Sequence, residues 1–174
     1  GTDRVADALA KHDPQKQYSK VVNLQGDLPN IYPGHIRAVL EGLDQCDMST
    51  LIAKLTNHLD LEDQTKVKAI IDRQPNKHPI AANFLRRVGS EYPFPYWHHI
   101  GVYAFRREAL EKFVNLTPTT REKERSLEQM RALDNGMTIA TMKVDAIPQS
   151  VDVMDDILKL SPPKIVPIHL LTTQ

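Results

Sequence analysis

Apolar residues along this chain follow two patterns: short runs rich in β-branched residues, and longer segments in which they recur every three or four positions. The runs predict buried strands at residues 21–24, 48–55, 66–71, 97–105 and 138–144. The spaced positions predict helices at 5–9, 34–46, 107–114, 119–133 and 153–160. Because strands and helices alternate, the pattern predicts a three-layer α/β domain.

The stretch from Val21 to Pro29 is the most informative one. Residues 21–24 suit a strand that is buried on both faces, and the strand pattern ends at Gly26 and Pro29. In an open α/β sheet, ligands bind at the carboxyl ends of the strands, so Gln25 and Asp27 would face a crevice. Asp27 is therefore a candidate metal ligand, although a turn or cap role before the next helix fits it equally well.

Residues 73–96 show no regular pattern and contain four prolines. This irregularity predicts a long surface excursion, which carries Arg86 and Arg87 side by side. Loops of this length in a compact domain serve binding or assembly, and a flexible linker is the alternative interpretation. After it, the period of two in residues 97–105 places His99 and Tyr103 on the same face of a strand.

The predicted helix 119–133 begins with the capping-box pattern Thr119-x-x-Glu122 and ends at Asn135-Gly136. Its apolar stripe leaves the neighbouring polar residues Glu128 and Gln129 to one side. Further along, Asp152 is placed to cap the last predicted helix. Thr2 or Asp3 is placed to cap the first one.

The composition is that of an ordinary globular domain of 174 residues, with 41% hydrophobic and 25% charged residues. Lysine plus arginine and aspartate plus glutamate each total 22. This balance disfavours nucleic-acid binding and requires a local cluster to hold any anionic ligand. No apolar run is long enough to insert into a membrane, no signal peptide opens the chain, and the single Cys46 agrees with a cytoplasmic protein.

Several well-known motifs are absent from the chain, among them G-x-G-x-x-G, G-x-x-x-x-G-K-[ST], H-E-x-x-H and G-x-S-x-G. His98 and His99 are adjacent on a predicted strand and would point to opposite faces, which disfavours a zinc site. The polar residues that remain at the ends of predicted elements are Gln25, Asp27, His99, Tyr103, Glu128, Gln129 and Asp152. Two aspartates suit Mg²⁺ when substrate phosphates complete its coordination, although each residue alone also has a purely structural explanation.

Taken together, the order of these stretches resembles that of the 3-deoxy-manno-octulosonate (Kdo) cytidylyltransferases. The matching pieces are Gly1-Thr2-Asp3-Arg4, Val21 to Asp27 with Pro29, His99-Ile100-Gly101-Val102-Tyr103-Ala104-Phe105, Ser126-Leu127-Glu128-Gln129-Met130-Arg131, Asn135-Gly136, and Val151-Asp152 with Asp155-Asp156. The stretches beginning at His99 and Ser126 are the most specific, and the likeness covers most of residues 1–160.

The resemblance implies a three-layer, Rossmann-like nucleotidyltransferase fold with a mixed, mostly parallel sheet. It implies that the 2-hydroxyl of Kdo attacks the α-phosphate of CTP, which gives CMP-Kdo and pyrophosphate for lipopolysaccharide synthesis, and that the enzyme is a homodimer. By position, Asp27 and Asp152 would hold Mg²⁺ as the catalytic aspartates, and Arg4 would lie near the nucleotide. The residues implied around the sugar acid are Gln25, His99, Tyr103, Glu128 and Gln129, with Arg86 or Arg87 facing its carboxylate.

The chain departs from the family pattern in ways that affect these expectations. The family's first strand and its triphosphate-gripping loop would lie upstream of Gly1, so we expect an N-terminally truncated domain at 1–160 that is inactive alone. Leu28 replaces a common acidic residue, Ser150 replaces a common glycine, and the tail 161–174 matches nothing in the family. Two alternatives remain: a non-catalytic remnant that keeps the sugar pocket or the dimer surface, and a nucleotidyltransferase for another acidic sugar such as a sialic acid.

Overall fold

The structure, a computed structural model, describes residues 1–55, 57, 59–72, 78–88, 95–145, 147–151 and 154–158. The strands are β1 (Lys20–Asn23), β2 (Met48–Lys54), β3 (Lys68–Asp72), β4 (Ile80–Leu85), β5 (Trp97–Arg106) and β6 (Ile139–Val144). The helices are α1 (Thr2–His12), α2 (Pro33–Glu41) with the 3₁₀ turn η1 (Gly42–Asp44), α3 (Leu59–Glu62), α4 (Arg107–Val114), α5 (Thr120–Arg125), α6 (Gln129–Asp134) and α7 (Met154–Leu158). Within these ranges no helix has the length and apolar character needed to cross a membrane.

The strands form one mixed sheet in the order β1-β5-β2-β6-β4-β3. The predicted mixed α/β sheet is therefore confirmed, but its mostly parallel character is wrong for the described pairings. β2 and β6 pair in parallel, whereas β5 pairs antiparallel with β1, β2 and β3, and β4 pairs antiparallel with β3 and β6. The connection 73–79 is shorter than the dozen or more residues that a parallel crossover needs, so β3 and β4 run antiparallel.

The prediction of an irregular surface excursion over residues 73–96 is wrong, because this segment contains β4. Ile80–Leu85 pairs with β3 along its length and reaches β6 at one point, and its Phe84 side chain is fully buried. The four prolines around this short apolar run hid it, since prolines usually mark loops. Residues 73–77 and 89–94 lie outside the described residues.

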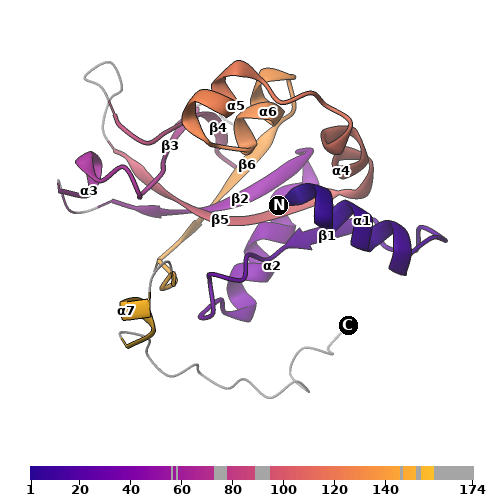
Figure 1. The fold of residues 1–174 in the computed structure, drawn as a ribbon, viewed down its shortest axis with the longest axis horizontal. Helices are drawn as coiled ribbons and strands as arrows, with labels where there is room; N and C mark the ends of the chain where they lie inside the picture. The colour runs from indigo at the N-terminus through magenta and orange to yellow at the C-terminus, as the bar shows by residue number, and fades with distance from the viewer. Residues whose placement is uncertain are drawn as a thin grey trace.

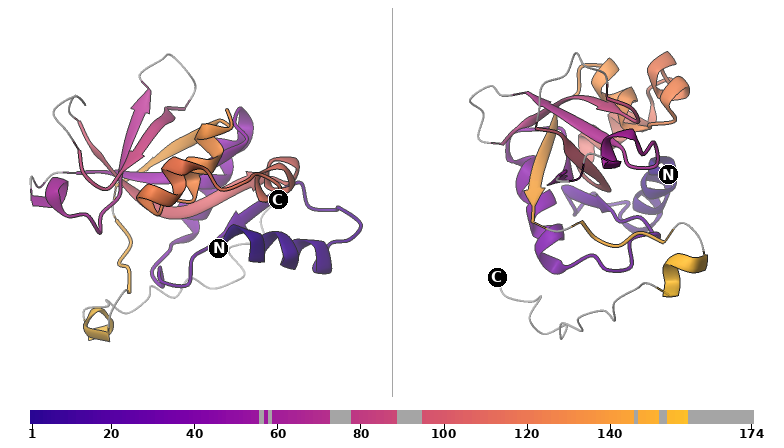
Figure 2. Two further views of the ribbon diagram at one scale, coloured as in Figure 1. Left: turned by 45° about the horizontal axis from the view of Figure 1, so that its top comes forward. Right: turned by 90° about the vertical axis from the view of Figure 1, so that its left-hand side faces the viewer.

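The sheet lies between two helical layers, as predicted. One apolar cluster packs β-sheet residues such as Phe105 against Leu110 of α4 and Met130 of α6, with the apolar face of α1 at its margin. The other packs Val102 against Val39 of α2 and its neighbours. Figure 1 shows α5 and α6 on one side of the sheet and α2 on the other, and the rotated views in Figure 2 show the same layers.

The predicted helix 119–133 is two helices rather than one. Its start is confirmed: Thr119 Oγ1 accepts the amide of Glu122, and the Glu122 carboxylate accepts the amide of Thr119. α5 then ends because Ser126 adopts the left-handed conformation at φ 52°, and the amide of Leu127 bonds back to the carbonyl of Glu122. This turn reorients the chain so that Gln129 begins a separate helix, α6, which ends before Gly136 as predicted.

Candidate substrate-binding site

β5 has one edge that is only partly paired. Its inner edge pairs with β2 on both sides of a register shift at residues 101–102, and its outer edge is shared by two short strands. β1 pairs with β5 residues 103–106, and β3 pairs with β5 residues 97–98. Between these two pairings, residues 99–102 have no strand register on the outer edge in the described part of the chain, although the amide of His99 bonds to the Val67 carbonyl at 2.8 Å. The sheet therefore has a notch beside the middle of β5.

A cavity of about 480 Å³ lies at this notch. Five of the residues predicted to form the site line it: Gln25, Asp27, His99, Tyr103 and Gln129. They come from the loop after β1, from β5 and from the start of α6. The fold thus brings together polar residues that are about a hundred positions apart in the chain.

The reason for this convergence differs from the one that the sequence suggested. β1 is an antiparallel strand at the edge of the sheet, with Val21 and Val22 only half-buried rather than buried on both faces. Gln25 and Asp27 reach the cavity because β1 stops at Asn23, opposite Tyr103, and the chain then turns past the unpaired part of β5. The site therefore forms at the notch, and residues that follow the carboxyl end of the parallel strand β6, such as Ile147 and Pro148, line it as well.

His99 and Tyr103 share a face of β5, as predicted, and their ring centroids are 5.5 Å apart. His99 Nε2 is 3.0 Å from Thr50 Oγ1, and its ring packs edge-on against Phe84. Burial, with a smaller contribution from His98, lowers the pKa of His99 to about 3. Burial, assisted by the Glu128 charge, raises the pKa of Tyr103 far above its ordinary range. At neutral pH His99 is uncharged and Tyr103 keeps its proton, so neither suits a general base.

Gln129 and Glu128 are neighbours with different surroundings. The Gln129 side chain is only 4% exposed, and its Nε2 is buried without a hydrogen-bond partner at the cavity. A buried donor of this kind costs roughly 1–3 kcal/mol unless a ligand or water accepts from it. Glu128 is absent from the cavity lining, and its carboxylate instead accepts from the amide and hydroxyl of Thr2, at 3.3 and 3.1 Å.

A chain of polar contacts connects α1 to the cavity. Asn23 Nδ2 donates to Thr2 Oγ1 at 3.5 Å, and Gln25 Nε2 donates to Asn23 Oδ1 at 3.2 Å. Thr2 is therefore not the helix cap that the sequence predicts: Gly1 is the N-cap, and Thr2 is the first helical residue. Its buried side chain contacts Glu128 and Asn23, and this contact fixes the start of α1 beside the cavity and orients the Gln25 amide.

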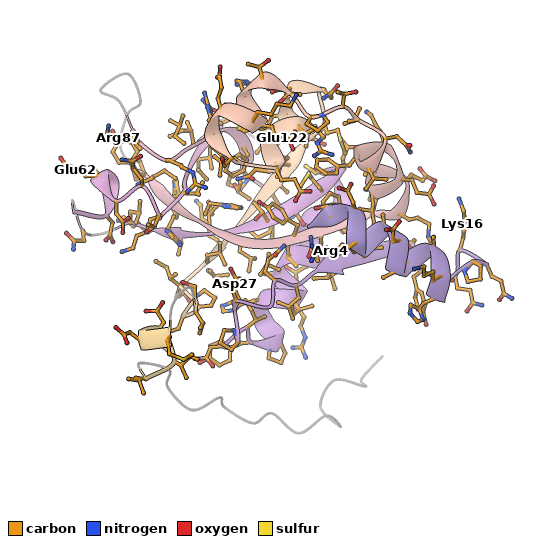
Figure 3. All side chains as sticks on the ribbon, viewed as in Figure 1. Arg4, Lys16, Asp27, Glu62, Arg87 and Glu122 are labelled. Carbon is orange, nitrogen blue, oxygen red and sulfur yellow. The ribbon has the colours of Figure 1, made fainter. Side chains whose placement is uncertain are left out.

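Neither Arg86 nor Arg87 lines the cavity. The Arg86 guanidinium donates to the carbonyls of Arg125, Gln64 and Ser126, at 2.9, 3.0 and 3.2 Å. Gln64 precedes the cavity-lining Thr65, and Ser126 precedes the cavity-lining Leu127, so Arg86 ties two walls of the site together. Arg87 is exposed, and Figure 3 shows it at the edge of the molecule, well apart from Asp27.

We expect Arg86→Lys to lower the free energy of unfolding by about 1–3 kcal/mol, because a lysine cannot bridge three carbonyls. Chemical denaturation measures this change. Arg87→Lys is the matched control and should change stability by less than about 0.5 kcal/mol. Equal stability of the two variants would show that the Arg86 contacts do not hold the site together.

Two further residues predicted for the site are Arg4 and Asp152. Arg4 is an exposed residue in the first turns of α1 and does not line the cavity. Asp152 lies outside the described residues, so its side chain cannot be compared with Asp27. The residue before it, Val151, donates its amide to the Asp27 carbonyl at 2.9 Å.

Sequence reasoning missed one wall of the cavity, which Thr65, Lys66 and His98 form. The Lys66 ammonium lies 2.5 Å from an Asp60 carboxylate oxygen, and the His98 Nδ1 is buried without a hydrogen-bond partner. Lys66 was read as the first residue of a strand, which begins instead at Lys68. No local signal marked this loop, because it reaches the site through the pairing of β3 with β5.

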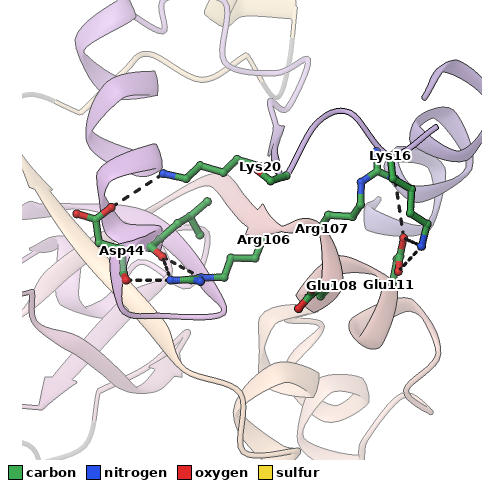
Figure 4. Close-up of a pocket in the computed structure, with 9 residues that line it drawn as sticks. Lys16, Lys20, Asp44, Arg106, Arg107, Glu108 and Glu111 are labelled. Carbon is green, nitrogen blue, oxygen red and sulfur yellow. Dashed lines mark hydrogen bonds and ion pairs between the residues drawn. The ribbon is translucent and has the colours of Figure 1, made fainter. Parts of the chain in front are cut away.

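A second cavity, of about 540 Å³, lies at the other end of β5 (Figure 4). Its cations are already engaged: Lys16 pairs with Glu111, Lys20 lies 4.0 Å from Asp44, and Arg106 donates to backbone carbonyls that include Leu43. None of the predicted site residues lines it. The cavity at the notch is therefore the better candidate for substrate binding.

Comparison with known proteins identifies the family of this chain. Residues 1–139 match the family described as cytidylyltransferase. The chain belongs to the cytidylyltransferase family. The 3-deoxy-manno-octulosonate cytidylyltransferase of Nitrobacter winogradskyi is 42% identical over 159 residues, which is 90% of this chain and 63% of that protein. The enzyme of the same name from Rhizobium meliloti is also 42% identical, over 91% of this chain and 64% of that protein.

Solved structures of cytidylyltransferases and related enzymes share the fold. A CMP:2-keto-3-deoxy-manno-octonic acid synthetase complexed with CTP superposes with a TM-score of 0.79 at 28% identity, over 91% of this chain and 65% of that chain. The inositol-1-phosphate CTP transferase from T. maritima, at 18% identity and a TM-score of 0.52, shares the fold alone. The chain spans slightly less than two thirds of the length of these first relatives.

Proposed function

We propose that this chain takes part in cytidylyl transfer from CTP to the 2-hydroxyl of Kdo, with CMP-Kdo and pyrophosphate as products. The observation that carries the proposal is the meeting of Gln25, Asp27, His99, Tyr103 and Gln129 around one cavity. The names of the relatives described above support the same substrates. A cytoplasmic location agrees with such a biosynthetic reaction and stays a prediction.

In this proposal the cavity binds the sugar acid mainly by hydrogen bonds. Gln129 supplies an unpartnered buried amide, Tyr103 supplies a phenol that keeps its proton, and Gln25 is held in orientation by Asn23. Phosphoryl transfer requires chiefly that the attacking hydroxyl and the α-phosphate are positioned and that charge on the phosphate oxygens is stabilised. Such residues position the sugar without themselves reacting.

Mg²⁺ fits the residues at one side of this cavity. Asp27 lines the cavity with an exposed carboxylate, and its backbone is bonded to Val151, the residue before Asp152. Mg²⁺ usually takes one or two carboxylates and completes its coordination with water and phosphates, so a larger cluster of ligands is unnecessary. Within the described ranges, no three His, Cys, Asp or Glu residues are grouped to hold a metal ion. Asp27 and Asp152 would hold Mg²⁺, which when bound supplies positive charge beside the phosphates.

Gln129→Ala tests the proposal. In an enzyme that carries this chain, we expect the KM for Kdo to rise about tenfold or more, while the KM for CTP stays within about twofold, because the lost donor serves the sugar. Asn135→Ala, at the far end of the same helix, is the control and should leave both constants unchanged. A raised KM for CTP with an unchanged KM for Kdo would contradict the assignment.

A homodimer is part of the proposal because the sequence resembles a family of dimers. Light scattering at micromolar concentration would reveal it. The proline-rich, aromatic segment from Tyr92 to Trp97 is apolar enough to suit a dimer surface, and residues 92–94 of it lie outside the described residues. Binding of Kdo without any turnover, in a protein complete enough to bind CTP, would favour the non-catalytic alternative.

A further inference from the structure

Gly101 occupies an unusual position for a glycine. It lies in the interior of the ten-residue strand β5, where glycine weakens a strand because it adds backbone freedom and contributes no side-chain packing. The register of β5 against β2 shifts here, so Gly101 and Val102 lie in a bulge, where glycine is common. The bulge does not by itself require a residue without a side chain. The φ of Gly101 lies outside the left-handed region, and a Cβ atom built on Gly101 would meet no heavy atom within 4 Å beyond its chain neighbours. The fold itself would accept a side chain here.

The space beside Gly101 belongs to the cavity at the notch, which Gly101 lines. The bulge inserts two residues into β5, so the alternation stays in step across it and Gly101 keeps the face of His99 and Tyr103. A side chain at residue 101 would therefore project between the two predicted sugar contacts. The empty space is continuous with the binding site rather than with the apolar core.

The peptide group of Gly101 also faces the notch. The carbonyls of Ile100 and Val102 accept hydrogen bonds from Thr50 Oγ1, at 3.1 and 2.9 Å, so they point toward β2. Because successive peptide groups of a strand point to opposite edges, the N–H and C=O of Gly101 point to the outer edge. On that edge, the strand registers of β1 and β3 stop at Tyr103 and His98.

We propose that Gly101 determines specificity for the sugar acid: its peptide group hydrogen-bonds the substrate in the notch, and its missing side chain makes room for the sugar ring. An unpaired strand edge offers one donor and one acceptor, which match a carboxylate or hydroxyl and a second hydroxyl. The inference rests on the proposed function, since it assumes that an acidic sugar occupies this cavity.

Gly101→Ala tests the inference on the chain itself. Calorimetric titration with Kdo, alone and with CTP and Mg²⁺, should show at least a tenfold loss of affinity relative to the unchanged chain. The Tm should stay the same or rise by a few degrees, because the added methyl group restricts the unfolded chain and meets no protein atom. Gly101→Ser should behave in the same way.

Gly34→Ala is the matched control. A Cβ at Gly34 also meets no atom within 4 Å, but this residue lies in α2 and does not line the cavity. We expect this variant to keep full affinity for Kdo. Unchanged affinity in Gly101→Ala would overturn the inference alone, as would a loss of affinity accompanied by a fall in Tm. Failure of the unchanged chain to bind Kdo under either condition would overturn the proposed function as well.

Discussion

Asp27→Asn is expected to lower the turnover of cytidylyl transfer by about a hundredfold or more in an enzyme that carries this chain. The carboxylate lines the cavity, and the amide that replaces it is a much weaker ligand for a hard cation such as Mg²⁺. The loss should fall on turnover more than on the KM for CTP, because the missing charge acts on the phosphate oxygens during transfer. Steady-state measurement of pyrophosphate release gives both constants.

Asp7→Asn is the control for this experiment. Asp7 is an exposed aspartate of α1 that does not line the cavity, so its replacement changes the net charge equally without reaching the site. Raising the Mg²⁺ concentration should restore part of the turnover of Asp27→Asn. If the variant were merely misfolded, added Mg²⁺ would restore no turnover. Near-normal turnover of Asp27→Asn at limiting Mg²⁺ would refute the role of this carboxylate.

The second large expected effect is a loss of folding stability at acid pH, which we attribute to His99. Burial lowers the pKa of His99 to about 3 in the folded protein from its ordinary value of 6.5, so between these pH values the unfolded chain binds the proton more readily. Stability from this residue is therefore complete above pH 6.5 and falls as the pH drops toward 3. At pH 5 the expected loss is about 2 kcal/mol, from 1.36 kcal/mol per pKa unit.

The free energy of unfolding at pH 7 and pH 5 should show this effect as a difference between variants. His99→Gln removes the titrating ring, so its stability should fall less between the two pH values than that of the unchanged chain. Burial also lowers the pKa of His35 and His98, and their contributions remain in both proteins and cancel in the comparison. His12→Gln, at an exposed helix end, should keep the full pH dependence. An unchanged pH dependence in His99→Gln would show that His99 protonates without unfolding the site.

Local patterns predicted the elements whose signals lie within a few residues. The alternation in β5 placed His99 and Tyr103 on one face, and the Thr119–Glu122 pair predicted the start of α5 correctly. These features depend on strand alternation and on short-range capping. The resemblance then implied a set of polar site residues, and five of these line one cavity.

Features that depend on distant contacts were not predictable in this way. β4 becomes a strand because β3 and β6 pair with it, although the prolines around it suggested a loop. The resemblance implied that Arg86 or Arg87 faces the sugar carboxylate, whereas the Arg86 guanidinium donates to three carbonyls from two separate segments. The notch itself follows from where β1 and β3 stop along β5, which no single segment specifies.

A crystal structure of the chain with Kdo, CTP and Mg²⁺ is the most direct test of the account. We predict that the sugar acid lies in the notch beside Gly101 and accepts a hydrogen bond from the buried Nε2 of Gln129, with the Asp27 carboxylate turned toward the nucleotide phosphates. Kdo bound instead in the cavity beside Arg106, or in the notch but out of reach of Gln129, would contradict the assignment of the site.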